Sequence, residues 1–530
     1  MRKQDEIIRQ YETGKISRRN FMKYLAGLGL SIPAVNSMLA KLGSEAMAAT
    51  PVRGGRLRFA IAGGSQSEVL DPAKIGCSTD VQRCQSLYNK LVRATPDLTF
   101  EPELAESWEA NKSADEWIFK LRKGVEWHNG ADFKAQDVLY SLRRIMDPKT
   151  GSSARLYFTD VTDLRAEDNH TVHIRLAQPD VDFPSVFTAK CSHIVPDGFT
   201  DFDHAIGTGP FKLKSFKPGH GCLVERNPNY WKSGLPYVDE VESFSIPDNI
   251  ARVNALLAGD IHLMDTLDPM LIDKVDASSH TKVLSTPSGY RVPFIMNCTL
   301  PPYDNPDVRM ALKLLIDRER YNQIVYQGNA QIGNDHPVAP VYPDFCDEIP
   351  QRRHDPEKAK FLLKKAGFEN FIFNLHVSNI GVGAERGALV YSDMAAKAGV
   401  KVKVVKEPTD GYWKAVWMKK AFLMCHWYMR PTAQMQLALT FKSDVSMNDT
   451  FWKRPDFDKL LAEARSTFDK SRRKALYCEM QRMVNQDGGT IIPSFVNKLD
   501  AVSARVKNIS LSPIVGLGVF NLPEACWLEA

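Results

Sequence analysis

The chain lacks a surplus of charge of either sign. Its 530 residues include 68 Lys and Arg against 63 Asp and Glu, a formal net charge of +5. Residues 1–50 hold 8 basic and 4 acidic residues, which leaves the rest with 60 against 59. Nucleic-acid binding needs a basic surplus on the folded part of a protein, so the composition excludes it. With 44% hydrophobic residues, the chain is also too apolar to be a disordered polymer.

Cysteines are few and widely spaced. The nine thiols occupy positions 77, 84, 191, 222, 298, 346, 425, 478 and 526, with no C-x-x-C motif. An odd, dispersed set is unlike the dense, even set of a disulfide scaffold. Cys77 and Cys84 are seven residues apart, which in a helix separates their Cα atoms by ~10 Å, beyond disulfide reach. We expect buried free thiols at most of the nine positions.

Motifs for catalysis and for membrane insertion are missing. The chain has no P-loop, no H-E-x-x-H and no G-x-S-x-G motif, and its 12 histidines are scattered. Beyond the N-terminal region, no apolar run reaches the ~20 residues of a transmembrane helix. We therefore expect no enzyme activity, no cofactor and no resident metal.

The N-terminal region has the pattern of an export signal. The sequence SRRNFMK at residues 17–23 precedes a mildly apolar run from Tyr24 to Val35, and a small-residue site, AMA at residues 46–48, follows. This order predicts a twin-arginine signal peptide over residues 1–48, which delivers a folded protein to the periplasm. The alternative is an amphipathic first helix with incidental paired arginines.

Two helices after residue 300 carry start and stop signals. The first is capped by Asn305 and ends before Gly328, and the second is capped by Asp355 and ends before Gly367. A proline directly follows each cap, where its fixed φ suits the first helical turn. Apolar residues recur at helical spacing within both segments.

A strand, helix, strand pattern comes next. Residues 371–377 and 400–404 alternate as strands around a helical stretch at 384–398, which predicts a parallel sheet. Residues 421–427, AFLMCHW, form a nearly continuous apolar run, typical of a strand buried on both faces. The pattern indicates an α/β protein, although residues 55–245 are richer in strands.

Seven motifs resemble the periplasmic solute-binding proteins of peptide, opine and nickel ABC importers, which form the bacterial extracellular solute-binding protein family 5. They are ELAESW (103–108), FKLRKGV (119–125), WHNG (127–130), IGTGPF (206–211), NPNYW (227–231), NPDVRMA (305–311) and DPEKAKFLLKKA (355–366). The resemblance covers about residues 55–510, with its motifs in family order.

The resemblance implies a two-lobed periplasmic-binding-protein fold of the cluster C type, with hinge-linked lobes that close on a ligand. It places lobe I, with a smaller subdomain, at residues 49–289 and lobe II at 290–492, and it returns residues 493–530 to lobe I. It also implies a monomer that carries a peptide-like or opine-like solute to an ABC permease in the inner membrane.

The loop after residues 421–427 is the expected binding site, because ligands of open parallel sheets collect beyond the carboxyl ends of strands. The resemblance implies an aspartate here in dipeptide binders, where it pairs with the ligand's ammonium group. No acid lies between Ala421 and Lys442 in this sequence. The loop instead carries Arg430, whose planar guanidinium suits a carboxylate or phosphate. The alternative is a structural salt bridge or a solvent-facing arginine.

Other candidate ligand-binding residues surround this loop. Aromatic side chains there are candidates for stacking on the ligand, and polar ones for hydrogen bonds, although each type also occurs in cores, hinges and turns. The complete set is Arg430, Trp427, Tyr428, Met429, Thr432, Trp413, Tyr290, Phe294, Asn297 and Asn379.

Two other functions stay open. A nickel or metal-chelate binder of the same family would use Cys425 and His426, but adjacent residues on a strand point to opposite faces. A cofactor-carrying oxidoreductase would also suit twin-arginine export.

Overall fold

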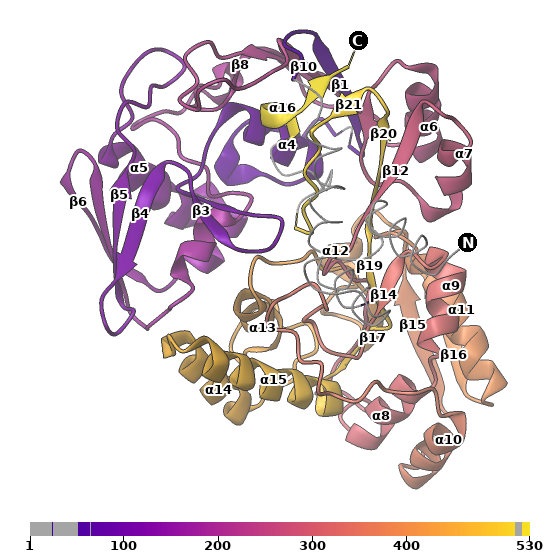
Figure 1. The fold of residues 1–530 in the computed structure, drawn as a ribbon. Coiled ribbons are helices and arrows are strands. Elements are labelled where there is room, and N and C mark those ends of the chain that lie inside the picture. The colour runs from indigo at the N-terminus through magenta and orange to yellow at the C-terminus, as the bar shows by residue number, and fades with distance from the viewer. Residues whose placement is uncertain (1–23, 25–50, 64, 515–521, 530) are drawn as a thin grey trace.

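The computed structural model describes residues 24, 51–63, 65–514 and 522–529. These residues form two lobes, drawn mainly in indigo to magenta and in pink to yellow in Figure 1. Apart from Tyr24, the expected signal peptide at residues 1–48 lies outside the described residues. No helix in the described ranges has the length and apolar character needed to cross a membrane.

The first lobe contains a seven-stranded mixed sheet. Its strands, in spatial order, are β12 (Thr281–Thr286), β20 (Lys498–Ser503), β11 (Leu263–Met264), β1 (Arg56–Ile61), β10 (Glu240–Ser245), β9 (Gly221–Arg226) and β8 (Phe211–Lys217). The central strand β1 pairs in parallel with both β10 and β11. The helices α4 (Ser78–Leu87), α6 (Asn249–Ala258) and α7 (Ile272–Asp276) also belong to this lobe.

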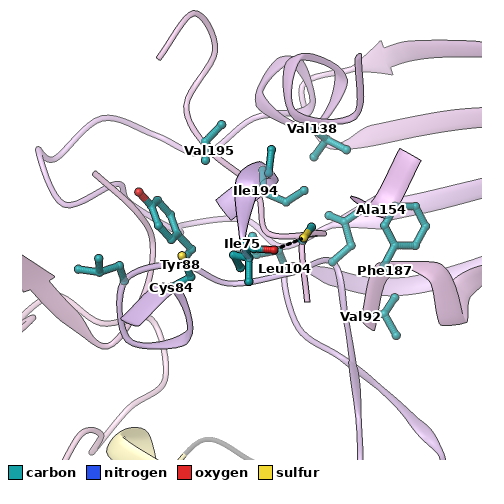
Figure 2. Close-up of a cluster of buried hydrophobic side chains, with 14 of the residues drawn as sticks. Ile75, Cys84, Tyr88, Val92, Leu104, Val138, Ala154, Phe187, Ile194 and Val195 are labelled. Atoms are coloured by element: carbon teal, nitrogen blue, oxygen red, sulfur yellow. Dashed lines mark hydrogen bonds between the residues drawn. The ribbon is translucent and has the colours of Figure 1, made fainter. Parts of the chain in front are cut away.

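A four-stranded antiparallel sheet extends the first lobe, at the left of Figure 1. It comprises β4 (Ala105–Ala110), β5 (Glu116–Leu121), β7 (Thr171–Leu176) and β6 (Val161–Asp168), and α5 (Ala135–Met146) contacts β6 and β7. The hairpin of β2 (Val92–Ala94) and β3 (Phe100–Pro102) connects to it. Figure 2 shows Cys84 of α4 and Tyr88, the residue that follows this helix, gathered with Ile75, Phe187 and Ile194 in the buried core of this lobe.

The second lobe contains a five-stranded sheet covered by helices. Its strands are β16 (Lys401–Lys406), β15 (Ile372–Val377), β17 (Phe422–Met424), β13 (Phe294–Met296) and β18 (Thr490–Ile491). Its helices are α8 (Pro306–Leu314), α9 (Arg318–Tyr326), α10 (Pro356–Lys365), α11 (Ala384–Lys397), α12 (Tyr412–Ala415), α13 (Ala433–Phe441), α14 (Pro455–Ser466) and α15 (Lys470–Asp487). As expected, β15 and β16 pair in parallel and are connected in the chain by α11. All three residues of β17 are buried.

The helix expected between Asn305 and Gly328 is two helices, which corrects the sequence prediction. Asn305 caps α8 as expected, accepting a hydrogen bond from the backbone N–H of Asp307. The chain leaves the helix after Leu314, and Asp317 then caps α9 by accepting from the N–H of Arg320. Apolar periodicity continues across the break because both helices turn a buried face to the same core, so periodicity alone does not reveal a second cap.

Two segments cross between the lobes and are hydrogen-bonded to each other. One runs from β12 to β13, and the other runs from β19 (Ser494–Val496), which pairs with β14 (Ala330–Ile332), to β20. The backbone N–H of Val496 donates to the carbonyl of Tyr290 (2.7 Å), and the hydroxyl of Ser288 donates to the carbonyl of Val496 (2.9 Å). This pairing forms a two-stranded hinge.

The C-terminal segment lies against the first lobe, where Figure 1 draws α16 (Leu522–Ala525) and β21 (Val506–Lys507) near β1 and β10. β21 pairs with β22 (Trp527–Leu528). The carboxylate of Glu524 accepts a hydrogen bond from Tyr230 (2.8 Å) and pairs with Lys232 (2.5 Å). These contacts fix the end of the chain to first-lobe residues.

Seven of the nine cysteines are free thiols, as expected for most of them, and Cys77 is not bridged to Cys84. Cys346 and Cys478 form a disulfide, which the sequence analysis missed. The two are 132 residues apart, so their spacing gave no signal of pairing.

Candidate functional site

A cavity of about 230 Å³ lies between the lobes. The first lobe contributes the start of α4, the 3-10 helix Ser153–Tyr157 and residues 188–191. The second lobe contributes the loop after β17, through Tyr428, Met429, Arg430 and Pro431. Both lobes therefore line the cavity, which lies beyond the carboxyl end of the buried strand β17.

The cavity wall is cationic. Lys90, Lys190 and Arg430 line it, and no aspartate or glutamate among the described residues does so. Lys90 is buried and its Nζ donates to the carbonyl of Thr188 (3.0 Å). Burial lowers the pKa of Lys90 to about 8, so this amine remains mostly protonated at neutral pH. A wall with these three cations favours an anionic guest.

Arg430 has no counter-ion within the described part of the chain. Its Nε is buried without a hydrogen-bond partner, and no described carboxylate lies within ion-pair distance of its guanidinium. The structural salt bridge considered from the sequence therefore finds no partner here. The residue as a whole is partly exposed, so an arginine that faces solvent remains the alternative to one that binds ligand.

Contacts from two other segments hold the loop that carries Arg430. Trp427 exchanges both backbone hydrogen bonds with Arg291 (2.9 and 3.1 Å), and its indole Nε1 donates to Asp449 (3.0 Å). Met429 is buried against Gly289, whose N–H lies 3.2 Å from its sulfur. A Cβ at Gly289 would lie 2.9 Å from the Met429 side chain, so glycine allows this close approach.

Four aromatic rings form a cluster beside the loop. The ring of His426 lies 5.0 Å from Trp413, 5.1 Å from Tyr428 and 5.9 Å from Tyr290. Trp413 and Tyr428 keep 44% and 50% of their surface exposed. The structure thus brings Tyr290, Trp413 and Tyr428 together, and Tyr428 also lines the cavity.

The remaining candidates lie elsewhere. Thr432 caps α13 by accepting from the N–H of Met435 (3.1 Å). Phe294 is fully buried in β13, packed against Tyr391 at 4.7 Å. Asn297 accepts from the N–H and hydroxyl of Thr299, as a turn asparagine does, and Asn379 is exposed beyond β15. None of these four lines the cationic cavity.

A second cavity, of about 680 Å³, adjoins the first. Both are lined by Leu156, Tyr157, Leu439 and Met447. Its lining includes four aspartates, Asp160, Asp180, Asp444 and Asp458, against the cations Lys442 and Arg465. The cleft is thus cationic at one end and net acidic at the other.

The first-lobe wall was not predicted from the sequence; it includes Cys77, Lys90, Lys190 and Cys191. These residues come from turns and helix ends far apart in the chain, with no shared spacing. The pattern at Gly76 and Cys77, directly before α4, signals only a helix start.

Cys425 and His426 do not meet at one point. The Cys425 sulfur lies 3.4 Å from Asp449 in the core, whereas His426 belongs to the aromatic cluster on the other face. Among the described residues, the group of three potential ligands close enough to hold a metal is Cys346, Glu348 and Cys478, and two of these share the disulfide.

Two lobes, a hydrogen-bonded hinge and a cavity between them define a solute-binding protein of the periplasmic-binding-protein class. Residues 99–448, more than half of the chain, match the family described as Bacterial extracellular solute-binding proteins, family 5 Middle. The chain belongs to this family, and the α/β two-lobed fold expected from its motifs is confirmed.

The chain is similar to proteins of this family along most of its length. The periplasmic oligopeptide-binding protein OppA of Escherichia coli (strain K12) is 27% identical, covering 82% of this chain and 86% of its own. The glutathione-binding protein GsiB of Escherichia coli O6:K15:H31 is 26% identical, covering 85% and 90%. The structure of AgaA from A. tumefaciens R10, in complex with agropinic acid, superposes with a TM-score of 0.78 at 25% identity, covering 90% and 99%.

Proposed function

We propose that this protein captures an anionic opine-like or peptide-like solute in the cavity between its lobes and delivers it unaltered to an ABC permease in the inner membrane. The observation that carries this proposal is Arg430, a guanidinium without a described counter-ion in a cavity wall that also holds Lys90 and Lys190. The relatives support the solute class: OppA is named as an oligopeptide-binding protein, GsiB as a glutathione-binding protein, and AgaA was solved in complex with agropinic acid.

A ligand that contacts both lobes favours the state in which the lobes are closed around it. A ligand anion that meets Arg430 of the second lobe and Lys90 or Lys190 of the first interacts fully only when the lobes are together. Such a ligand stabilises the closed state by the difference between its interactions with the two states. Charge-assisted hydrogen bonds in the cleft contribute about 1.5–3 kcal/mol each.

In this proposal the protein binds its solute in the periplasm, and the twin-arginine sequence at residues 17–23 is the signal for its export. No bond in the solute is made or broken. The described lining of the cationic cavity consists of its three cations, apolar residues, hydroxyls and two thiols, and we assign no nucleophile, base and oxyanion donor among them.

An unmodified peptide is a second candidate, favoured by the acidic cavity. A C-terminal carboxylate at Arg430 and an ammonium group facing Asp160 or Asp458 would match the opposite charges of the two adjoining cavities. The two candidates share the anionic group at Arg430 and differ at the other end of the ligand.

Isothermal titration calorimetry tests the proposal with agropinic acid, glutathione, the dipeptide Met-Leu and its C-terminal amide as probes. We expect Arg430→Ala to weaken carboxylate binding about 10- to 100-fold and to leave the amide's weak binding unchanged. Arg472→Ala, which removes an exposed arginine of α15 paired with Glu463, is the matched control and should bind as wild type. Unchanged affinity of Arg430→Ala for every anionic probe would overturn the proposal.

A further inference from the structure

The hydroxyl of Tyr342 binds both backbone polar groups of Arg430. It donates to the Arg430 carbonyl oxygen (2.7 Å) and accepts from the Arg430 N–H (3.1 Å). The two residues are 88 positions apart, and Tyr342 is only 3% exposed. One buried side chain therefore fixes the peptide groups on both sides of the Arg430 Cα.

Arg430 needs this support because it lies in a loop. The residue lies past the end of β17, so no sheet partner satisfies its backbone, and the following Pro431 has no N–H to donate. The proline also restricts Arg430 to extended backbone conformations. With the backbone held by Tyr342, the side chain leaves the loop in a fixed direction toward the cavity.

The segment carrying Tyr342 is in turn tied to α15. Cys346, four residues further on, forms the disulfide with Cys478 of α15. Gln481, one turn along the helix, accepts from the N–H of Cys346 (3.1 Å) and donates to the carbonyl of Asp344 (2.8 Å). A covalent bond and two hydrogen bonds thus connect α15 to residues 344–346, which directly follow the residue that holds Arg430.

We propose that Tyr342 is a positioning residue for Arg430, and that the Cys346–Cys478 disulfide holds Tyr342 in place, so that affinity for anionic solutes depends on the oxidation state of this cysteine pair. The inference rests on the proposed role of Arg430 as the anion-binding group. The disulfide belongs with the oxidising periplasm, where such bonds persist.

Anion binding by Arg430 depends on the position of its loop because the guanidinium forms directional hydrogen bonds. Its fork of donors recognises a carboxylate only in a narrow range of directions, so a displaced loop loses part of each hydrogen bond. Removing a single hydroxyl contact is worth about a 5- to 10-fold change in affinity, less than removal of the guanidinium itself.

The test compares Tyr342→Phe, the double variant Cys346→Ser/Cys478→Ser and Arg430→Ala by calorimetry with agropinic acid, glutathione, Met-Leu and the Met-Leu amide. The matched control is Tyr391→Phe, which removes an equally buried hydroxyl that donates to the carbonyl of Leu312 (2.9 Å), remote from the cavity lining. Thermal unfolding of every variant separates lost stability from lost affinity, and hydrogen exchange at the Arg430 amide reports the loop directly.

Tyr342→Phe and the double serine variant should each bind the carboxylate probes about 5- to 10-fold more weakly, bind the amide as wild type does and exchange the Arg430 amide faster. Tyr391→Phe should lose comparable stability and keep full affinity. If Arg430→Ala loses affinity while Tyr342→Phe keeps both affinity and amide protection, the inference is wrong and the proposed function stands. If Arg430→Ala also keeps its affinity, the proposed function fails and this inference fails with it.

Discussion

Arg465 of the second lobe lies across from Asp180 of the first, with its Nη2 3.2 Å from the aspartate Oδ2. The same nitrogen lies 2.6 Å from Asp160, and the amide of Gln434 donates to Asp180 at 3.0 Å. These residues line the acidic cavity and not the cationic one. The lobes are thus held together by a contact separate from the anion site.

This contact predicts that closure of the ligand-free protein depends on pH. Burial raises the pKa of Asp180 to about 6, with the nearby Asp182 acting in the same direction and Arg465 opposing it. Separating the lobes returns Asp180 to water and to an ordinary pKa of about 4. The closed state therefore binds the proton more tightly, and closure is favoured as the pH falls from about 6 toward 4 and is weakened as the pH rises through 6.

Small-angle scattering of the ligand-free protein measures this effect. The radius of gyration should be smaller at pH 5 than at pH 7.5, because pKa values of about 6 in the closed state and about 4 in the open state favour closure by about 1.4 kcal/mol more at pH 5. Asp180→Asn should reduce this difference, and the neighbouring Asp182, whose pKa burial also raises and which lies 3.5 Å from Arg473 of the second lobe, accounts for any remainder. Asp163→Asn, which changes an exposed carboxyl on β6, should keep the wild-type dependence. A wild-type protein that opens at acid pH would contradict this prediction.

Cys77 should be protected by ligand. Its thiol lines the cationic cavity and is partly exposed, whereas Cys298 is partly exposed outside that lining. Burial raises the pKa of both thiols, so we expect slow alkylation of both at neutral pH.

Alkylation with N-ethylmaleimide followed by peptide mapping measures this protection. A saturating anionic probe should slow modification of Cys77 at least 5-fold and leave Cys298 unchanged. Equal rates at Cys77 with and without a bound probe would show that the ligand occupies another part of the cleft.

Local signals predicted the second lobe well. The caps at Asn305 and Asp355 and the strand, helix, strand unit around α11 depend on neighbouring residues, and the structure contains all of them. The cavity loop at residues 428–431 was predictable because it follows a fully buried strand. Short-range chemistry specifies these features, although it did not reveal the break between α8 and α9.

Features that depend on distant residues were not predictable. The Cys346–Cys478 disulfide, the Tyr342 contact to Arg430 and the first-lobe wall at Lys90 each join segments that share no spacing in the sequence. Phe294 looked like a cleft residue because it follows the hinge, yet it faces the core, since a central strand has both faces covered.

The central claim is that the cleft holds an anionic guest through Arg430. Native mass spectrometry of wild-type and Arg430→Ala protein, purified without refolding, tests this most directly, because it identifies whatever ligand the protein retains. We predict that wild type retains a compound bearing a carboxylate or phosphate and that Arg430→Ala loses it. A retained compound without an anionic group, or one held equally by both proteins, would contradict the claim.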